Sequence, residues 1–278
     1  MKILLLGGSG FVGSALKKVA VLEGLTLHAP SHAECDIRDG GALERVFESY
    51  HPTVVINATG YTAVDQAEDE REKAFELNAE VVGRLASLAE RHGAATVQLS
   101  TDYIFDGAQE DGYEEDALPT PLNVYGESKV MGEKLLMQAT KRFFIVRTAW
   151  PFGHDGRNFV NTMLNCAAEG KPLSVVTDQR GSPTFTQDLA ESLLALIKSE
   201  NYGIYHRVNS GSCSWYELAC EIFLQLGIPY EIKPITSEQL GRKAQRPPVS
   251  ILKTTKLPPL RHWREALEEY LQTQPLIL

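Results

Sequence analysis

The sequence lacks several features that would place a chain in a particular class at once. No apolar run among its 278 residues approaches the roughly 18 that a membrane-spanning helix needs. The first residues lead directly into a short apolar segment, without a charged-then-apolar leader and cleavage site. The formal net charge is −9 and no long basic block is present, which argues against nucleic acid as a partner. We therefore expect a soluble, cytoplasmic protein without membrane or nucleic-acid partners.

Cysteine is also scarce. The chain has four cysteines, none of them in a C-x-x-C pair or at a spacing typical of metal ligands: Cys35, Cys166, Cys213 and Cys220. We expect four reduced, buried thiols. Hydrophobic content of 43% and charged content of 23% are ordinary for a globular protein. A chain of this length can bury a sizeable core, as one large domain or as two unequal ones.

What is present begins with a glycine-rich turn. The apolar run at 3–6 is typical of a strand buried on both faces, and G-G-S-G-F-V-G at 7–13 follows it, ahead of a helical pattern. In a dinucleotide-binding turn Gly7 allows the tight turn, Gly10 lets the backbone approach the pyrophosphate, and Gly13 lets helix and strand pack closely. The spacing is G-x-x-G-x-x-G, not the commoner G-x-G-x-x-G, but the strand and helix around it favour a nucleotide cofactor.

Strands and helices alternate through the first half of the chain. Further apolar runs predict strands at 25–29, 54–57, 96–99 and 143–147, with helical patterns between them, the longest at 68–92. Such alternation is typical of an α/β fold with a Rossmann-like, doubly wound parallel sheet. Ligands of these sheets bind beyond the carboxyl ends of the strands.

Beyond residue 150 this alternation weakens. Helices are expected at 158–169, 187–199, 215–226 and 263–271, and strands at 173–177 and 205–208. We assign residues 1–150 to an NAD(P)-binding domain, completed by a segment near 186–208. Residues 151–278 are expected to form mostly a smaller α/β substrate-binding lid.

A tyrosine and a lysine stand four residues apart at Tyr125 and Lys129, so a helix would present both on one face. A nearby ammonium group stabilises a phenolate and lowers the tyrosine pKa from its usual value of about 10. Such a pair can deliver a proton to a carbonyl oxygen. A hydroxyl of Ser100 or Thr101, at the end of the preceding strand, would hydrogen-bond the same oxygen. Alone, Y-x-x-x-K is common in helices whose tyrosine packs and whose lysine is solvated.

Several further blocks of sequence follow one another along nearly the whole chain. They are Y-T-A-V-D-Q-A-E at 61–68, S-T-D-Y-I-F at 100–105, P-L-N-V-Y-G at 121–126, R-T-A-W at 147–150, N-F at 158–159, D-Q-R-G-S-P-T at 178–184 and R-P at 246–247. Together with the glycine turn, Asn57-Ala58 and the Tyr125/Lys129 pair, they resemble the dTDP-4-dehydrorhamnose reductase family of the extended short-chain dehydrogenase/reductase superfamily. The resemblance implies reduction of dTDP-4-dehydro-L-rhamnose to dTDP-L-rhamnose with NADPH or NADH, a step of nucleotide-sugar and polysaccharide biosynthesis.

The resemblance also implies roles for individual residues. Tyr125 would protonate the ketone oxygen, Lys129 would hold the nicotinamide ribose, and Thr101 would orient the carbonyl. Substrate contacts are implied for Thr101, Asp102 and Trp150. Cofactor contacts are implied for Gly7, Gly10, Phe11, Val12, Gly13, Asp36, Ile37, Ala58, Gly60, Tyr61, Thr62, Leu99, Tyr125 and Lys129. Arg180 and Arg246 are further candidates for contact with a diphosphate, because a guanidinium matches phosphate oxygens bidentately.

Two departures from the family pattern bear on metal and cofactor. Some members are described as magnesium-bridged dimers that use two glutamates, at positions where this chain has Ala15 and Gln187. A methyl group and an amide make a poor magnesium site, so we expect no structural metal, and either a monomer or a homodimer. The end of the second predicted strand, at 28–32, has no acidic residue to bind a ribose 2′-hydroxyl. Without an acid there, a 2′-phosphate would not be repelled, which favours NADPH. No arginine follows to bind that phosphate, so the choice between NADPH and NADH stays open.

Residues of this chain also bear on other activities of the same superfamily. A sugar-nucleotide dehydratase needs an acid after the Thr-Asp pair, where this chain has Tyr103. A nucleotide-sugar epimerase uses the same Tyr, Lys and Thr, but it retains its oxidised cofactor through turnover. A related NADP-binding protein is the regulatory subunit of a methionine adenosyltransferase, without known need for turnover. The intact Tyr125, Lys129 and Thr101 favour an enzyme over that last role.

Overall fold

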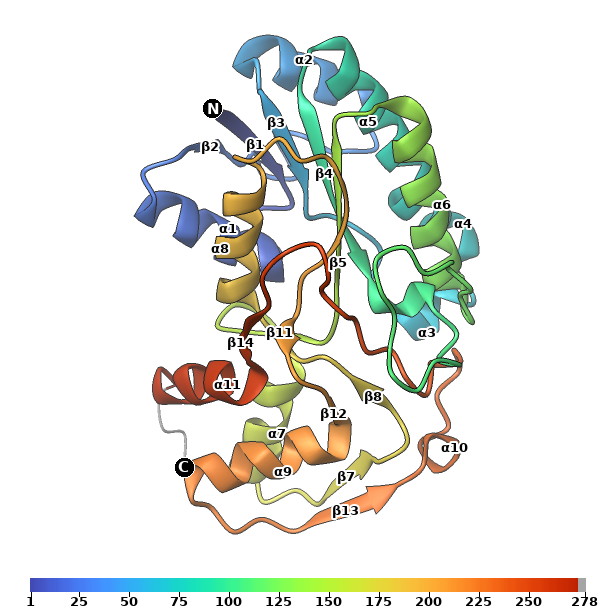
Figure 1. Cartoon of the computed structure of the whole chain (residues 1–278), viewed down its shortest axis with the longest axis vertical. Coiled ribbons are helices and arrows are strands. Elements are labelled where there is room, and N and C mark those ends of the chain that lie inside the picture. The colour runs from blue at the N-terminus through green and yellow to red at the C-terminus, as the bar shows by residue number, and fades with distance from the viewer. Residues whose placement is uncertain (275–278) are drawn as a thin grey trace.

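A six-stranded parallel sheet forms the centre of the larger half of the molecule in the computed structural model, which describes residues 1–274 (Figure 1). Its strand order is β10-β5-β4-β3-β1-β2, and all neighbouring strands are parallel. The strands are β1 (Lys2–Leu6), β2 (Thr26–His28), β3 (Val54–Asn57), β4 (Ala95–Thr101), β5 (Phe143–Thr148) and β10 (Gly203–His206). The order reverses between β1 and β3, which confirms the doubly wound α/β fold and marks where such sheets bind ligands.

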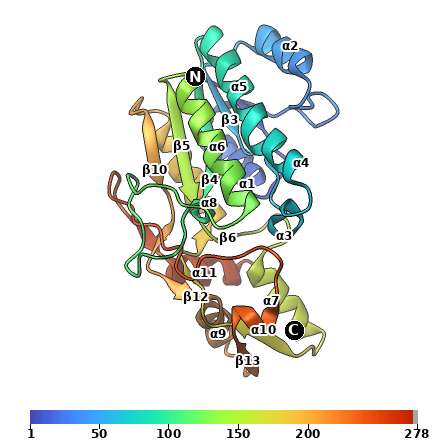
Figure 2. The ribbon, with the colours of Figure 1, turned by 90° about the vertical axis from the view of Figure 1, so that its right-hand side faces the viewer.

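Helices cover both faces of this sheet, so alternate side chains of each strand enter two separate cores (Figure 2). Ile3 and Leu5 of β1 pack with α1 and α8 on one face. Leu4 and Leu6 pack with α2 and α5 on the other, where α6 lies beside α5. The helices are α1 (Phe11–Leu22), α2 (Gly40–Tyr50), α5 (Val81–Arg91), α6 (Val124–Ala139) and α8 (Thr186–Leu196). The continuous apolar run at 3–6 therefore reflects burial on both faces.

Most of the chain beyond Pro151 forms a smaller half built from short paired strands (Figure 1). The pairs are β6 (Pro151–Phe152) with β9 (Thr184–Phe185), β7 (Leu173–Val176) with β13 (Ile232–Ile235), β8 (Arg180–Gly181) with β12 (Cys213–Ser214), and β11 (Asn209–Ser210) with β14 (Leu260–His262). The helices of this half are α7 (Phe159–Ala168), α9 (Trp215–Leu226), α10 (Ser237–Leu240) and α11 (Trp263–Gln272). A single hydrophobic cluster that includes Phe152, Trp263 and Tyr270 joins these pieces.

The helix predicted over 68–92 is interrupted in the structure. The chain forms α3 (Val64–Ala67), α4 (Arg71–Phe75), a π-helical turn (Glu76–Glu80) and then α5. Buried in the π-turn, Asn78 accepts a hydrogen bond from the Tyr61 N–H at 2.9 Å and donates to the Ser128 hydroxyl at 2.9 Å. The predicted helical stretch is confirmed over 71–91. The π-turn within it was not predicted, because apolar periodicity does not report side-chain contacts of this kind.

The last strand of the large sheet also differs from expectation. A strand was expected at 205–208, whereas β10 covers 203–206 and runs parallel to β5 at the edge of the sheet. It follows α8, which packs against α1, so the segment near 186–208 lies with the first half of the chain. The loop expected at 178–184 contains β8 and the start of β9. The domain boundary at residue 150 stays a prediction.

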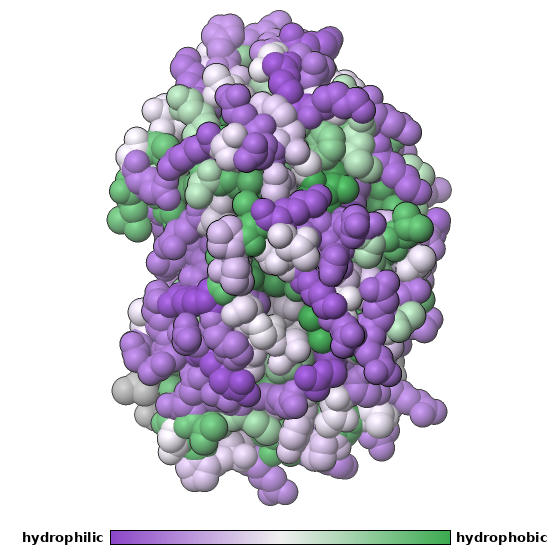
Figure 3. All heavy atoms as spheres, in the orientation of Figure 1, coloured by the Kyte–Doolittle hydropathy of each residue, from purple (hydrophilic) through white to green (hydrophobic). Residues whose placement is uncertain are grey.

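Polar side chains cover most of the molecular face drawn in Figure 3, and the apolar ones on it form small separate groups. Among residues 1–274, no helix combines the length and the apolar character needed to cross a membrane. The large apolar side chains are gathered mostly in the buried clusters of the two halves.

Candidate active site

A cleft of about 660 Å³ lies at the carboxyl ends of β1, β3, β4 and β5. Its walls come from the glycine turn after β1, the loop after β2, the end of β3, the start of α6 and the segment around β6. The cleft thus includes the point between β1 and β3 where the strand order reverses, as expected for the ligand site of a doubly wound sheet.

The glycine turn brings backbone groups to the cleft that other residues would cover. Gly7 has a φ of 84°, which residues with a Cβ rarely adopt. A Cβ on Gly13 would lie 2.0 Å from the Gly7 carbonyl oxygen, so α1 can approach the turn this closely only with glycine there. Gly10 is the N-cap of α1, and no side chain of residues 1–274 caps the first N–H groups of the helix. These donors, at the positive end of the helix dipole, suit the pyrophosphate of a dinucleotide.

Most of the predicted cofactor residues line this cleft. They are Gly7, Gly10, Phe11, Val12, Asp36, Ile37, Ala58, Gly60, Thr62, Leu99, Tyr125 and Lys129. Of the predicted cofactor residues, all of them within the described part of the chain, Gly13 and Tyr61 lie outside its wall. Gly13 instead packs against the turn, and the Tyr61 hydroxyl donates to Glu70 Oε2 at 2.7 Å. This hydrogen bond raises the pKa of Tyr61 to about 12.

The loop after β2 brings an arginine and a histidine to the wall of the cleft. Arg38 and His32 both line it, beside Asp36. Arg38 binds the Asp36 carboxylate through Nε to Oδ1 at 3.0 Å and Nη2 to Oδ2 at 2.6 Å, which lowers the pKa of Asp36 to about 2. The sequence showed no arginine at 28–32, but Arg38 reaches the cleft from further along the loop. Sequence reasoning missed it because no pattern placed the end of this loop beside the cofactor turn.

Tyr125 and Lys129 face the cleft from the first turns of α6, as their spacing predicts. The helix begins where Asn123 Oδ1 accepts the Gly126 N–H at 2.8 Å. Lys129 is buried, and its Nζ donates to the Leu99 carbonyl oxygen at 2.8 Å. Burial lowers the pKa of Lys129 to about 8, although Glu133 opposes that shift. Lys129 therefore still carries its charge at neutral pH.

The pKa of Tyr125 moves opposite to the expected direction. Burial raises it to about 12, a hydrogen bond with the Thr101 side chain opposes the rise, and the charge of Asp102 adds to it. Burial of the phenol therefore outweighs the lowering that the sequence predicts from the Lys129 ammonium group. At neutral pH Tyr125 is a protonated phenol, which is the form that can donate a proton.

The end of β4 places a hydroxyl and a carboxylate next to Tyr125. Thr101 Oγ1 donates to Asp102 Oδ1 at 3.0 Å and accepts the Tyr103 N–H at 3.2 Å. Asp102 is only 3% exposed, and this burial raises its pKa to about 6, with Ser250 opposing the rise. Its Oδ2 atom is buried and has no hydrogen-bond partner within residues 1–274. A buried carboxylate oxygen without a partner suits a ligand hydroxyl.

Ser100 and Thr101, which the sequence leaves as alternatives, have different partners. Ser100 Oγ donates to Glu133 Oε1 at 2.5 Å. Arg147 on β5 binds the same carboxylate through Nε at 3.1 Å and Nη2 at 2.7 Å. Ser100, Glu133 and Arg147 are all buried. The Ser100 hydroxyl is therefore committed to this ion pair, and the Thr101 hydroxyl is the one beside Tyr125.

Trp150 is packed inside the C-terminal half rather than exposed to a ligand. It is 7% exposed, and its ring stacks on Trp215 with centroids 3.6 Å apart and planes 8° apart. A Cβ on Gly181 would lie 2.4 Å from the Trp150 ring, so glycine is required there. Phe159 continues the group, with its ring centroid 4.6 Å from that of Trp215. The S-x-x-E capping box at Ser214 could have located the helix start, but no sequence signal pointed to the stacking.

The two arginines that the sequence favours for a diphosphate are both paired with carboxylates. Arg246 Nη2 donates to Asp65 Oδ2 at 2.9 Å, and this contact lowers the pKa of Asp65 to about 2. Arg180 Nη1 lies 3.3 Å from Glu217 Oε2. A third arginine, Arg157, lines the cleft, although sequence reasoning did not single it out.

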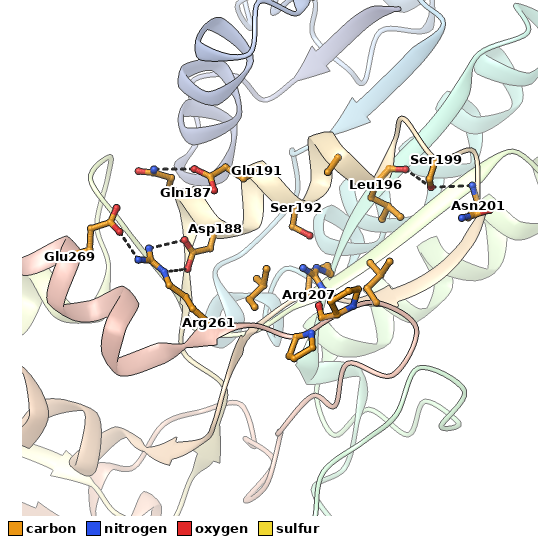
Figure 4. A pocket seen from close by; sticks show the side chains of 15 residues that line it. Gln187, Asp188, Glu191, Ser192, Leu196, Ser199, Asn201, Arg207, Arg261 and Glu269 are labelled. Carbon is orange, nitrogen blue, oxygen red and sulfur yellow. Dashed lines mark hydrogen bonds and ion pairs between the residues drawn. The ribbon is translucent and has the colours of Figure 1, made fainter.

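A second hollow of about 770 Å³ lies between α8, α11 and the segment before β14, and it contains none of the proposed catalytic residues (Figure 4). At one end of it Arg261 binds Asp188 Oδ1 at 2.8 Å and Glu269 Oε2 at 2.5 Å. Gln187 Nε2 donates to Glu191 Oε1 at 3.0 Å. Among residues 1–274, no three His, Cys, Asp or Glu side chains are grouped to hold a metal ion. The expected absence of a structural metal stays a prediction.

Comparisons with known proteins agree with this geometry. The family described as RmlD substrate binding domain matches residues 1–275. The spore coat polysaccharide biosynthesis protein SpsK of Bacillus subtilis is 41% identical over 98% of this chain and 97% of its own length. A dTDP-4-dehydrorhamnose reductase of Streptomyces griseus is 40% identical over 96% of this chain and 91% of its own.

The fold comparison points the same way. The crystal structure of dTDP-4-dehydrorhamnose reductase from Bacillus anthracis in complex with NADP is similar with a TM-score of 0.95 and 35% sequence identity. The match covers 99% of this chain and 100% of that one. The resemblance drawn from the sequence motifs is therefore confirmed, and the chain belongs to the family of the RmlD substrate binding domain.

Proposed function

We propose that this protein reduces the C4 ketone of dTDP-4-dehydro-L-rhamnose to form dTDP-L-rhamnose, with NADPH or NADH as the reductant. The observation that carries the proposal is the juxtaposition of Tyr125, Lys129 and the glycine turn around one cleft. A 40% identical relative bears the name of this reductase, and a 35% identical structure holds NADP. The product would enter polysaccharide biosynthesis.

The cleft has the groups that a dinucleotide requires. The uncapped N–H groups of α1 would bind the pyrophosphate, and Asp36 and Ile37 would lie near the adenine. Lys129 uses one N–H on Leu99 and has two more for the hydroxyls of the nicotinamide ribose. When bound, the reduced dinucleotide supplies hydride to the ketone carbon. Arg38 at the adenine end favours NADPH, because a guanidinium suits a 2′-phosphate.

Proton transfer in this proposal belongs to Tyr125. As hydride reaches the carbon, negative charge develops on the ketone oxygen, and the Tyr125 phenol donates its proton to that atom. The Lys129 ammonium group stabilises the phenolate that remains, and the Thr101 hydroxyl stabilises it when its proton turns from Asp102 Oδ1 to the phenolate. Thr101 is held for this task by its hydrogen bonds to Asp102 and Tyr103.

The sugar would lie against the junction of the two halves. The free Oδ2 of Asp102 is suited to accept a sugar hydroxyl, and its unpaired state supports this assignment. Trp150 lies behind this position, held between Trp215 and Gly181, and would shape the pocket that receives the sugar ring. The roles of Thr101, Asp102 and Trp150 remain proposals, as does a cytoplasmic monomer or homodimer.

The test measures loss of reduced nicotinamide absorbance with enzymatically prepared dTDP-4-dehydro-L-rhamnose. Tyr125→Phe should lower kcat by about 10²–10⁴-fold, because only the proton donor is lost. Tyr103→Phe is the matched control, since its ring packs edge-on to Tyr125 with centroids 6.1 Å apart. It should keep most of the activity.

Two outcomes would contradict the proposal. Tight NADPH binding without oxidation by this sugar would favour the regulatory-subunit role or another keto sugar. Conversion of the sugar without net consumption of NADPH would favour an epimerase.

A further inference from the structure

The loop between β6 and α7 crosses from the C-terminal half to the cofactor turn. Lys18 of α1 forms an ion pair with Asp155 of this loop, Nζ to Oδ2, at 2.8 Å. Gly156 lies against Phe11, the first residue of α1, because a Cβ there would be 3.5 Å from Cδ2 of the Phe11 ring. The loop at 153–158 therefore lies beside the helix end that the cofactor's phosphates would occupy.

Hydrogen bonds within the loop hold it in this position. Asn158 Nδ2 donates to the Gly153 carbonyl oxygen at 2.9 Å and closes the loop at its base. Asn158 Oδ1 accepts the Asn161 N–H at 3.0 Å, so the same side chain caps α7. Asn161 in turn accepts a hydrogen bond from the Tyr270 hydroxyl at 2.5 Å. The loop is thus anchored to α7 and α11 on one side and to α1 on the other.

Arg157, next to the closing asparagine, has an exposed side chain and lines the cleft with Gly10 and Phe11. Within residues 1–274 its guanidinium has no hydrogen bond or ion pair to another protein group. Arg38, Arg180 and Arg246 are each paired with a carboxylate. Among these four arginines, Arg157 is therefore the one that lines the cleft and has no carboxylate partner within residues 1–274.

We propose that Arg157 binds the pyrophosphate of the dinucleotide, opposite the uncapped N–H groups of α1. The inference rests on the proposed function in requiring a dinucleotide in the cleft. A guanidinium and a helix amino terminus are complementary donors for one diphosphate, the first by charge and paired hydrogen bonds, the second by backbone N–H groups. A nucleotide sugar also carries a diphosphate. We assign the contact to the cofactor, because Arg157 shares its wall of the cleft with the glycine turn.

The experiment compares the wild-type protein with Arg157→Gln by calorimetric titration with NADPH, NADH and dTDP. The variant should bind NADPH and NADH each about tenfold or more weakly, because a charge-assisted hydrogen bond to the shared pyrophosphate is lost. Its affinity for dTDP and its unfolding temperature should not change. Arg264→Gln is the matched control, since Arg264 is also exposed in the C-terminal half but pairs with Glu221 at 2.9 Å. This control should bind all three ligands as the wild type does.

A second comparison tests the position of the loop. Asp155→Asn breaks the ion pair with Lys18 but leaves the Arg157 guanidinium intact. Asp155→Asn should weaken the binding of both dinucleotides by a smaller factor than Arg157→Gln does. This loss of affinity should disappear when Arg157→Gln is already present. An equal loss of dinucleotide affinity in the wild-type protein and in the Arg157→Gln variant would show that Asp155 acts without Arg157.

The remaining outcomes each decide against the proposal. Loss of dTDP affinity with unchanged dinucleotide affinity would assign Arg157 to the nucleotide sugar. A loss of affinity for NADPH but not for NADH would assign Arg157 to the 2′-phosphate of NADPH. No loss for either dinucleotide would leave Arg157 outside the site. The readout is binding alone, so the assignment can hold even if the protein binds dinucleotide and does not reduce this keto sugar.

Discussion

The two halves of the molecule hold their buried side chains near the site in different ways. In the sheet half, hydrogen bonds cross between neighbouring strands and helices, as in Asn57 Nδ2 to Gln98 Oε1 at 2.8 Å and in the Ser100–Glu133–Arg147 group. In the C-terminal half, stacked rings such as Trp150 on Trp215 accompany hydrogen bonds such as Tyr270 to Asn161. Hydrogen bonds tolerate small changes of distance and angle only, whereas rings can slide over one another. We therefore expect the groups held by hydrogen bonds in the sheet half to respond more strongly to substitution than the stacked rings of the C-terminal half.

The largest expected effect is on the buried ion pair of the sheet half. Glu133→Gln should lower the free energy of unfolding by about 3–5 kcal/mol, because it leaves Arg147 buried without its counter-charge. Glu169→Gln breaks the exposed pair with Lys171 in the C-terminal half and should cost at most about 1 kcal/mol. Urea unfolding of both variants measures the contrast. Similar losses for the two pairs would remove the distinction between the halves.

A smaller loss of stability is expected at the glycine turn. Gly13→Ala should cost about 1–3 kcal/mol and weaken dinucleotide binding, because its Cβ would meet the Gly7 carbonyl oxygen at 2.0 Å. Gly40→Ala is the matched control, since the nearest atom to a Cβ there is 3.7 Å away, on the Arg84 side chain. It should be neutral or stabilising. Unchanged binding of NADPH by Gly13→Ala would show that the close approach of α1 is dispensable.

The pH dependence of kcat/KM should have two limbs. The alkaline limb should report a group of the sheet half, and the acid limb a group at its junction with the C-terminal half. Lys129 has a pKa of about 8, below its usual value, so its charge and the activity are lost as the pH rises through 8. Asp102 has a pKa of about 6, above its usual value, so its carboxylate is lost as the pH falls through 6. Lys129→Arg should remove the alkaline limb.

Ser250→Ala tests the acid limb of the pH profile, as Lys129→Arg tests the alkaline limb. The Ser250 side chain, from the C-terminal half, lowers the pKa of Asp102 by hydrogen bonding, so its loss should move this limb to higher pH. The alkaline limb should stay in place. A shift of both limbs together would show that the two groups respond as one unit.

The smallest effect is expected from the aromatic stack. Trp215→Leu should cost about 0.5–1.5 kcal/mol beyond its lost buried area and should raise KM for the sugar. The dissociation constant of NADPH should not change, since Trp215 does not line the cleft that holds the glycine turn. A matching rise in the NADPH dissociation constant would show that the stack supports the cofactor site as well.

The sheet half was predictable to a large extent because its signals are local. Each of these signals spans only a few consecutive residues: the apolar run at 3–6, the three glycines, and the four-residue spacing of Tyr125 and Lys129. These signals placed the strands, the cofactor turn and the candidate acid at one edge of the sheet. The family motifs then supplied Asp102 and Trp150 as candidates, without showing how either is held.

What the sequence did not reveal depends on contacts between distant segments. The π-turn is supported by Asn78 contacts with Tyr61 and Ser128, and the stack on Trp150 comes from Trp215. The choice between Ser100 and Thr101 needed the position of Glu133 on another element. Arg157 carries no motif, and only the path of its loop brings it to the cofactor turn. Periodicity reports which face of an element is buried, but not which partner covers it.

The uncapped start of α1 has a consequence for the lifetime of the protein. The first N–H groups of α1 have no side-chain cap within residues 1–274, and a dinucleotide that binds them only in the native state stabilises that state by mass action. At a concentration of 100 times the dissociation constant, this amounts to about 2.7 kcal/mol. The fraction of molecules open to proteases would then follow the cellular supply of dinucleotide. The amount of this reductase would be set partly by the reductant it consumes.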